Sequence, residues 1–215
     1  MENLKTINRK TKAAYNKASQ KYYDLFKNEL ANKPFDREFI DAYLGYFESQ
    51  FVIGDMGCGP CGHVEDYVSG KGYNIIGTDI SEKCVEIAKR HFPGIRFEVG
   101  DMSELKYEND YFDGLISYYS IIDTPKKYVS KVMDEYHRVM KEKGLLLLVL
   151  KEGEEEGYQK ELLGIETEIY MSLFTEGETK KYLESSGFEI IKMEKRAPYE
   201  DEIKLNRIFT MSKKR

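Results

Sequence analysis

The sequence predicts an α/β fold in which helices cover both sides of a mostly parallel, doubly wound sheet. From residue 51 to residue 150, short apolar runs of strand length alternate with longer segments of helical periodicity. The run 145–150 is apolar and uncharged, which is typical of a strand buried on both faces. The chain has 215 residues, of which 41% are hydrophobic, so one domain with a sizeable core is expected.

Two helices are predicted before this alternating region. The first covers residues 9–30, where apolar residues recur at helical spacing: Ala14, Ala18, Tyr22, Phe26 and Leu30. The segment Asn32-Lys33-Pro34 interrupts that pattern. A second helix follows, and its apolar stripe contains Phe39, Ile40, Tyr43, Leu44 and Phe47. Residues 1–48 are therefore expected to form an N-terminal helical extension.

The alternating region predicts a series of strands joined by helices. The predicted strands are 51–55, 74–79, 95–99, 112–118 and 145–150. A short helix is expected around 64–68, and Ser81 is placed to cap a helix that runs to about Phe92. Pro125 suits the first turn of a long helix whose apolar face reaches Met140, and Gly144 is expected to end it. Strands that alternate with helices favour a parallel sheet.

The C-terminal part has a different pattern. Residues 152–164 are acidic and contain glycine, whereas 165–174 alternates like a strand, so 151–175 is expected to be a lid-like insertion. A helix is predicted at 176–186, ended by Gly187. Residues 188–196 and 203–211 then predict an antiparallel strand pair that closes one edge of the sheet.

Bulk composition excludes several classes of protein. The net charge of −5 lacks the basic surplus that nucleic-acid binding requires. No apolar run approaches the roughly 20 residues that span a bilayer, and the N-terminus has no apolar segment of the kind found in secretory signals. A cytoplasmic location is therefore expected. Three cysteines in such a chain do not indicate a disulfide framework.

A glycine-rich loop follows the first predicted strand. Gly57, Gly59 and Gly62 match the pattern G-x-G-x-x-G, which allows a sharp turn and a close approach of the backbone to a nucleotide-like ligand. This motif alone also fits a nicotinamide-dependent oxidoreductase. The same loop contains Cys58-Gly-Pro-Cys61, the spelling of a thioredoxin dithiol. Gly57 stands where thioredoxins have an aromatic residue, which counts against redox chemistry without excluding it.

Acidic residues at successive strand ends favour one ligand over the others. Asp55 stands just before the glycines, where a carboxylate would repel a diphosphate but suits the cationic amine and sulfonium of S-adenosylmethionine. Asp79 ends the second strand, where a carboxylate can accept hydrogen bonds from both ribose hydroxyls. Asp101 and Met102 follow the third strand and could contact the adenine amino group and ring.

These segments resemble the class I S-adenosylmethionine-dependent methyltransferases, especially the small-molecule group called type 11 or type 25. The resemblance rests on Val52–Gly62, Gly77–Ser81, Phe97–Met102, Phe112–Ser120 and Tyr136–Leu147. In the last of these, Glu142-Lys143 replaces the usual proline. The family implies a Rossmann-like sheet of seven strands with an antiparallel last strand. It also implies S-adenosylmethionine as cofactor, bound by Asp55, Gly57, Cys58, Gly59, Asp79, Ile80, Asp101, Met102, Ser117 and Tyr118.

The resemblance divides the single domain 1–215 into parts. Residues 1–48 would be a helical cap, 49–150 the cofactor-binding core, 151–175 the lid-like insertion and 176–215 the C-terminal helix and hairpin. In this family the N-terminal helices lie over the cofactor, which makes Tyr15, Tyr22 and Tyr23 candidate pocket residues.

The methyl acceptor is not indicated by the sequence. No general base stands out, although Asp123 follows the fourth strand, where this family meets its acceptors. Asp123, Tyr15 and Tyr22 are therefore the candidate catalytic residues. Neither His63 nor His91 has partners at metal-binding spacing, so no metal is expected. The predicted protein is a monomer or homodimer that acts on a small molecule, without nucleic-acid or membrane partners. A thiol-disulfide redox protein and a non-catalytic cofactor-binding protein remain the alternatives.

Overall fold

The structure is a computed structural model that describes residues 2–215; Met1, the first residue of the predicted cap, lies outside the described residues. Its centre is a seven-stranded sheet in the order β3-β2-β1-β4-β5-β9-β8. The strands are β1 (Val52–Met56), β2 (Asn74–Asp79), β3 (Arg96–Val99), β4 (Phe112–Tyr118), β5 (Met140–Lys151), β8 (Phe188–Arg196) and β9 (Arg207–Lys214). Only β9 runs antiparallel to its neighbours, β5 and β8. The predicted fold class and the antiparallel last strand are confirmed.

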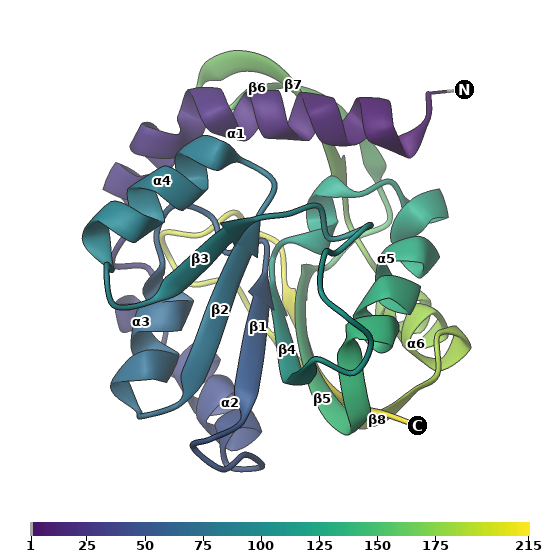
Figure 1. Cartoon of the computed structure of the whole chain (residues 1–215). Coiled ribbons are helices and arrows are strands. Elements are labelled where there is room, and N and C mark those ends of the chain that lie inside the picture. The colour runs from purple at the N-terminus through teal and green to yellow at the C-terminus, as the bar shows by residue number, and fades with distance from the viewer. Residues whose placement is uncertain (1) are drawn as a thin grey trace.

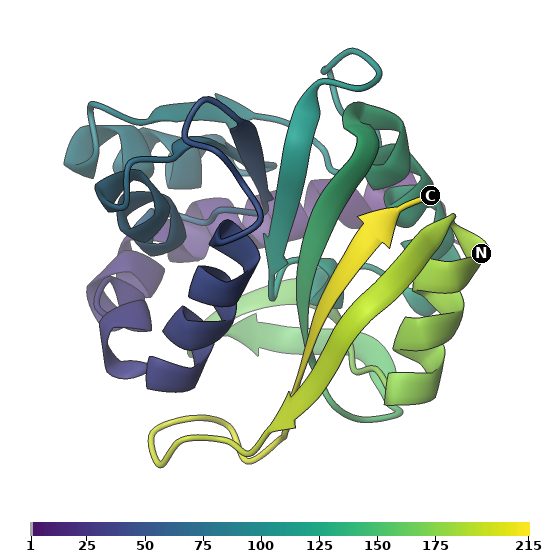
Figure 2. The same ribbon diagram turned by 90° about the horizontal axis from the view of Figure 1, so that it is seen from below.

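Helices cover both faces of this sheet (Figures 1 and 2). The helical elements are α1 (Leu4–Phe26), η1 (Leu30–Asn32), α2 (Pro34–Leu44), α3 (His63–Gly70), α4 (Glu82–His91), η2 (Ile121–Asp123), α5 (Lys126–Val139) and α6 (Glu176–Ser185). Side chains of α2 and α3 share one buried cluster with the sheet, and those of α5 and α6 share the other. The arrangement is therefore three-layered.

Strand β5 shows why the sheet is buried on both sides. Successive side chains of a strand point to opposite faces. Leu146 and Leu148 accordingly pack in the cluster that includes α5, whereas Leu147 and Val149 pack in the cluster that includes α2. All four are at most 1% exposed. Both faces of this strand are buried, so apolar residues are favoured at successive positions. This is the physical reason why the apolar run 145–150 predicted a buried strand.

Local capping fixes several helix boundaries. The hydroxyl of Ser81 accepts a hydrogen bond from the backbone of Cys84, which confirms its predicted capping role at α4. Thr175 and Glu178 form a reciprocal capping box at the start of α6. Gly187, with φ +83°, ends that helix as predicted.

The helix α1 lies across the edge of the sheet where the parallel strands end, here called the carboxyl edge (Figure 1). Behind it lies a separate hairpin of β6 (Glu156–Leu162) and β7 (Ile165–Ser172). The predicted strand in the second half of the lid-like insertion is confirmed as β7. Its partner β6 was not predicted, because its residues are polar and mostly exposed and show no alternation. The hairpin and α1 contact each other above the sheet.

Several predicted boundaries are wrong, including the start of β5, which begins at Met140. The helix α1 begins at Leu4, because Asn3 caps it by accepting a hydrogen bond from Thr6, and it ends at Phe26. The long helix α5 ends at Val139, where the backbone turns extended, so Gly144 lies inside β5 and is not its C-cap. The last strand starts at Arg207, leaving residues 203–206 in an exposed loop.

Candidate active site

A cavity opens at the carboxyl edge where the strand order reverses, between β1 and β4. In open α/β sheets this reversal is the usual place for a ligand. The cavity contains about 1010 Å³ of empty space, counted to its open mouth, and α1 forms one wall.

The glycine loop forms the floor of the cavity. Gly57 has φ +88°, and a Cβ atom there would lie 2.2 Å from the Cβ of Ser120. No side chain fits at this position, because both the backbone conformation and the contact exclude it. Gly59 also has a positive φ, but nothing lies within 4 Å of its would-be Cβ. A ligand can therefore approach the backbone at Gly59 directly.

Asp79 ends β2 with its carboxylate only partly used. One oxygen accepts the backbone N–H of Gly59 at 2.9 Å, and the other accepts that of Ser81 at 2.8 Å. A carboxylate has about four acceptor positions, so each oxygen keeps one for a ligand. Burial raises the pKa of Asp79 to about 6, against the lowering effect of these two hydrogen bonds. The side chain is thus held rigidly in a position where it can accept two further hydrogen bonds.

Asp55 forms a buried carboxyl pair that the sequence did not indicate. Its partner is Glu65 of α3, and both side chains are at most 2% exposed. Burial raises the pKa of Asp55 to about 7, and burial together with the neighbouring Asp55 raises the pKa of Glu65. Asp55 also lines the cavity. The pair therefore places two closely spaced carboxyl groups at the end of β1, where burial opposes the ionisation of both.

Asp101 is fixed by α1 and by its own loop. The amide of Asn8 donates to one carboxylate oxygen at 2.7 Å, and the backbone N–H and hydroxyl of Ser103 donate to the other. Met102 lies beside it on the cavity wall. The N-terminal helix therefore takes part in the site at a residue that the sequence did not single out.

The structure brings two of the predicted catalytic residues into contact. The phenol of Tyr15 donates a hydrogen bond to the carboxylate of Asp123 at 2.7 Å, across 108 positions of sequence. Burial raises the pKa of Asp123 to about 7. Tyr22 lines the cavity beside Tyr15, with ring centroids 6.1 Å apart. Tyr23, in contrast, stacks on His91 at 4.1 Å and does not line the cavity.

Nine of the ten predicted cofactor residues line this cavity: Asp55, Gly57, Cys58, Gly59, Asp79, Ile80, Asp101, Met102 and Tyr118. Ser117 is the exception. It is fully buried and hydrogen-bonds the hydroxyl of Ser120 at 2.7 Å, on the face of β4 opposite Tyr118. Strand alternation sends its side chain away from the cavity.

The two cysteines of the loop are free and buried. Burial raises the pKa of both the Cys58 and the Cys61 thiols. Redox-active thiols show the opposite shift, because the thiolate is the reactive form. The thiol-disulfide alternative is not supported.

The cavity wall carries acidic side chains and, within the described residues, no lysine or arginine. Five carboxylates line it: Glu29, Asp55, Asp79, Asp101 and Asp123. No lysine or arginine of residues 2–215 is among the lining side chains. Such a wall repels a diphosphate and attracts a cation. The site therefore fits the sulfonium and ammonium of S-adenosylmethionine better than it fits a nicotinamide dinucleotide.

Residues 53–144 match the family described as "Methyltransferase domain". These residues, fewer than half of the chain, are similar to a methyltransferase domain. The matched residues run from β1 into β5 and supply most of the cavity wall. A search among curated proteins found no significant match.

Solved structures share the methyltransferase fold at low sequence identity. An S-adenosylmethionine-dependent methyltransferase from Methanosarcina mazei has a TM-score of 0.72 at 20% identity, covering 80% of this chain and 96% of its own. The 1,6-didemethyltoxoflavin-N1-methyltransferase of Burkholderia thailandensis, solved with S-adenosylhomocysteine, has a TM-score of 0.70 at 14% identity, covering 96% and 90%. A methyltransferase from Clostridium acetobutylicum has a TM-score of 0.67 at 17% identity, covering 93% and 98%.

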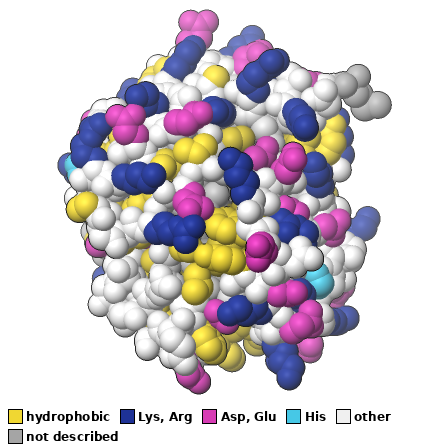
Figure 3. Space-filling model, viewed as in Figure 1, with side chains coloured by type: hydrophobic (Ala, Val, Ile, Leu, Met, Phe, Trp, Pro, Cys, Tyr) yellow, Lys and Arg dark blue, Asp and Glu magenta, His cyan; other side chains and the backbone are white. Residues whose placement is uncertain are grey.

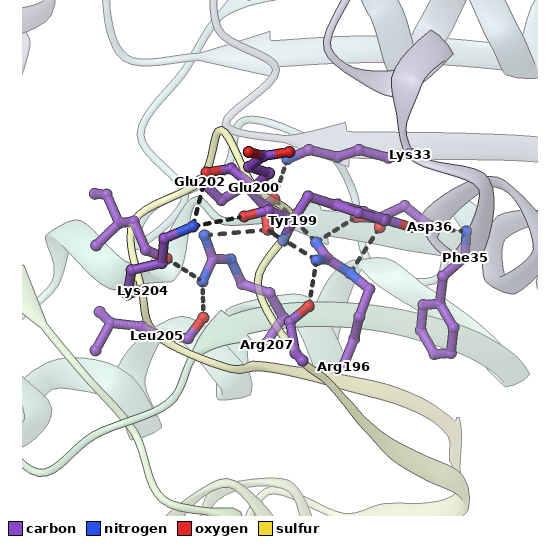
Figure 4. A network of polar contacts seen from close by, with 12 residues as sticks. Lys33, Phe35, Asp36, Arg196, Tyr199, Glu200, Glu202, Lys204, Leu205 and Arg207 are labelled. Atoms are coloured by element: carbon purple, nitrogen blue, oxygen red, sulfur yellow. Dashed lines mark hydrogen bonds and ion pairs between the residues drawn. The ribbon is translucent and has the colours of Figure 1, made fainter.

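An ionic network joins α2 to the C-terminal hairpin (Figure 4). Arg196 of β8 is its centre. Its Nε lies 2.9 Å from Asp36, and its Nη1 lies 2.8 Å from Glu202. Asp36 in turn accepts the hydroxyl of Tyr118 at 2.6 Å, and Arg196 donates to Tyr119 at 3.3 Å. The network thus connects the C-terminal hairpin to two tyrosines of the cavity wall.

Several wall residues were not predicted as site residues. These are His63, Asn8, Glu29 and Tyr119, all of which line the cavity. His63 was considered only as a metal ligand. Within residues 2–215, no three His, Cys, Asp or Glu side chains gather as a metal site. No helix of residues 2–215 combines the length and apolarity needed to cross a membrane. On the face shown in Figure 3, basic and acidic side chains are interspersed.

Proposed function

We propose that the protein transfers a methyl group from S-adenosylmethionine to a small-molecule acceptor. The observation that carries this proposal is Asp79, whose carboxylate is fixed by Gly59 and Ser81 and keeps two acceptor positions open to the cavity. A ribose has two adjacent hydroxyls that can donate to them. The remaining wall offers negative charge at Asp55 and no cation within the described residues.

Each part of the cofactor has a matching group in the wall. Asp79 would accept the ribose hydroxyls, and the open backbone at Gly59 would lie along the ligand. Asp101 would accept a hydrogen bond from the adenine amino group, with Met102 against the ring. Asp55 would face the ammonium of the methionine part. When bound, S-adenosylmethionine supplies a methyl group already activated by its sulfonium, so the protein mainly orients the acceptor and excludes water.

The domain organisation follows from the same proposal. Residues 1–48 cap the cofactor, 49–150 form the core, 151–175 carry the β6–β7 lid, and 176–215 complete the sheet. The cap and the lid contact each other over the carboxyl edge. Lys10 of α1 bridges them by binding Glu168 of β7 at 3.2 Å. A covered cavity of this kind admits a small acceptor and excludes a duplex.

A screen of acceptors with methyl-labelled S-adenosylmethionine tests the proposed function. Label should appear in at least one small molecule, with release of S-adenosylhomocysteine. Cofactor binding without transfer to any acceptor would instead favour a non-catalytic binding protein.

The loop cysteines are expected to be dispensable for cofactor binding. In the double variant Cys58→Ser/Cys61→Ser, the backbone amides and glycines that shape the loop are unchanged. Calorimetry should give a dissociation constant for S-adenosylmethionine within a few-fold of the wild-type value. Circular dichroism controls for folding, because both thiols are buried. A folded double variant that no longer binds would show that the thiols are required.

Cofactor binding is expected to weaken as the pH falls through about 6. The pKa of Asp79 is raised by burial to about 6, so its carboxylate is ionised above that pH and protonated below it. The protonated form loses acceptor capacity toward the ribose. Calorimetric titrations from about pH 5 to about pH 8 measure this slope. The variant Asp79→Asn cannot titrate, and an equally steep slope in that variant would assign the effect to another group.

A further inference from the structure

One group of wall residues takes no part in the cofactor contacts proposed above, although its Tyr118 was predicted to bind the cofactor. We call this the tyrosine end, formed by Tyr15, Tyr22, His63, Tyr118, Tyr119 and Asp123. Tyr15 contacts both Tyr22 and Asp123, and the rings of Tyr118 and Tyr119 lie 4.4 Å apart. His63 is edge-on to Tyr118 at 6.1 Å. The end thus combines aromatic faces with one carboxylate, both of which stabilise an organic cation.

Unsatisfied polar atoms indicate that a polar ligand belongs at this end. Both ring nitrogens of His63 are buried without a hydrogen-bond partner among the described residues. Burial lowers the pKa of His63 to about 4, so the imidazole is neutral and one nitrogen is a free acceptor. Buried polar groups without partners are uncommon, because each has lost its hydrogen bonds to water without gaining others. A ligand that donates a hydrogen bond would remove this cost.

The cations near the tyrosine end include Lys33 and Arg207, whose charged groups lie 5.6 Å and 5.7 Å from the ring centroid of Tyr119. Lys33 is bound to Glu29 and Glu202, both at 2.5 Å. Arg196 is bound to Asp36 and Glu202. Within each ion pair the positive and negative charges neutralise each other. Asp123 has no ion pair within 4 Å, although the buried ammonium of Lys151 and the carboxylate of Asp79 act on it from farther away.

We propose that the methyl acceptor is a small amine, held as its ammonium ion at the tyrosine end, with Asp123 as the group that takes its proton. This inference rests on the proposed function. Asp123 would attract the ammonium, His63 would accept a hydrogen bond from it, and the tyrosine rings would face its charge. A carboxylate or phosphate acceptor would meet Asp123 and Glu29 without a cation in the wall.

The reaction balances with groups that are already named. The ammonium gives one proton to a carboxylate oxygen of Asp123 and becomes a neutral amine with a free electron pair. The N–C bond then forms as the C–S bond of the cofactor breaks, the sulfur keeps the electron pair, and the products are a methylated ammonium and S-adenosylhomocysteine. A base whose pKa burial has raised to about 7 matches this proton transfer better than an ordinary aspartate does.

Matched acceptors and two variants test the proposal. The probes are 2-phenylethylamine, 2-phenylethanol and phenylacetate, which share a phenyl group and differ in the functional group. Smaller amines are compared in the same way with the alcohol and the carboxylate that have the same carbon skeleton. Binding is measured by calorimetry on protein saturated with S-adenosylhomocysteine, and transfer is measured by release of S-adenosylhomocysteine. At least one amine should bind about 10- to 100-fold more tightly than its alcohol and carboxylate counterparts, as expected for a charge-assisted hydrogen bond.

The variants Asp123→Asn and Lys151→Met should act in opposite ways. Asp123→Asn should remove the preference for the amine. Lys151→Met removes the positive charge that acts on Asp123 and would repel an ammonium ion, so it should leave the preference for the amine unchanged or strengthen it. The proposal is overturned if no amine binds, if an alcohol or carboxylate binds as tightly, or if Lys151→Met rather than Asp123→Asn removes binding. Methyl transfer to an acceptor that is not an amine would overturn the proposed acceptor class but not the proposed methyl transfer. Failure to bind S-adenosylmethionine would reject the proposed function instead.

Discussion

Replacing Asp79 by alanine is expected to raise the dissociation constant for S-adenosylmethionine by at least about 100-fold. Two ribose hydroxyls lose a charged acceptor, and hydrogen bonds to charged groups contribute about 1.5–3 kcal/mol each. The loop would also lose the anchor that holds the N–H of Gly59. Isothermal titration calorimetry of the purified variant measures the change.

Two further variants separate ligand contact from loop support. Asp79→Asn keeps one acceptor oxygen and the shape of the side chain, so an intermediate loss is expected. Asp66→Ala removes an exposed carboxylate of α3 outside the cavity and should leave binding unchanged. An unaltered dissociation constant in folded Asp79→Ala would reject the ribose assignment.

Replacing Arg196 by methionine is expected to destabilise the protein by about 3–5 kcal/mol, the usual effect of removing one partner from a buried ion pair. The side chain is 6% exposed, and its loss leaves Asp36, which is fully buried, without its cation. Glu202 would keep Lys33, so Asp36 dominates the cost. Chemical denaturation with urea measures the free energy of unfolding.

The neighbouring Lys195→Met variant is the matched control. Lys195 binds Glu152 at 2.5 Å, but its side chain is 37% exposed, and solvent-exposed pairs contribute little. No measurable loss of stability is expected. Equal stabilities of the Arg196 and Lys195 variants would contradict the structural role of the network. Arg196→Met should also loosen Tyr118 and Tyr119, because Asp36 and Arg196 hold their hydroxyls.

The sequence predicted the sheet well where burial alone decides the structure. The strands β2 and β4 have the predicted bounds, and nearly every residue of both strands is buried. The start of β5 was misplaced, since residues 140–144 form an irregular, mostly exposed stretch with Lys143 at φ +66°. The strand β6 was missed because its polar residues are ordered by pairing with β7, a contact that no local pattern reveals.

The site residues also fall into two groups, those that a local sequence pattern predicts and those that only tertiary packing brings together. Gly57, Asp55 and Asp79 were predictable, because motif spacing and strand ends place them at one edge of a parallel sheet. The contact between Tyr15 and Asp123 depends on how α1 crosses that edge, which is a matter of tertiary packing. Ser117 was misassigned because moving one position along a strand reverses the direction of the side chain. Glu65 had no signal, since its role arises only from its pairing with Asp55.

A calorimetric titration of the wild-type protein with S-adenosylmethionine, S-adenosylhomocysteine and NADH tests the central claim most directly. The cavity at the glycine loop should bind both sulfur compounds at a single site and should not bind NADH, because its wall carries carboxylates and, within the described residues, no cation. Binding of NADH in preference to S-adenosylmethionine, or no binding of S-adenosylmethionine, would contradict the account.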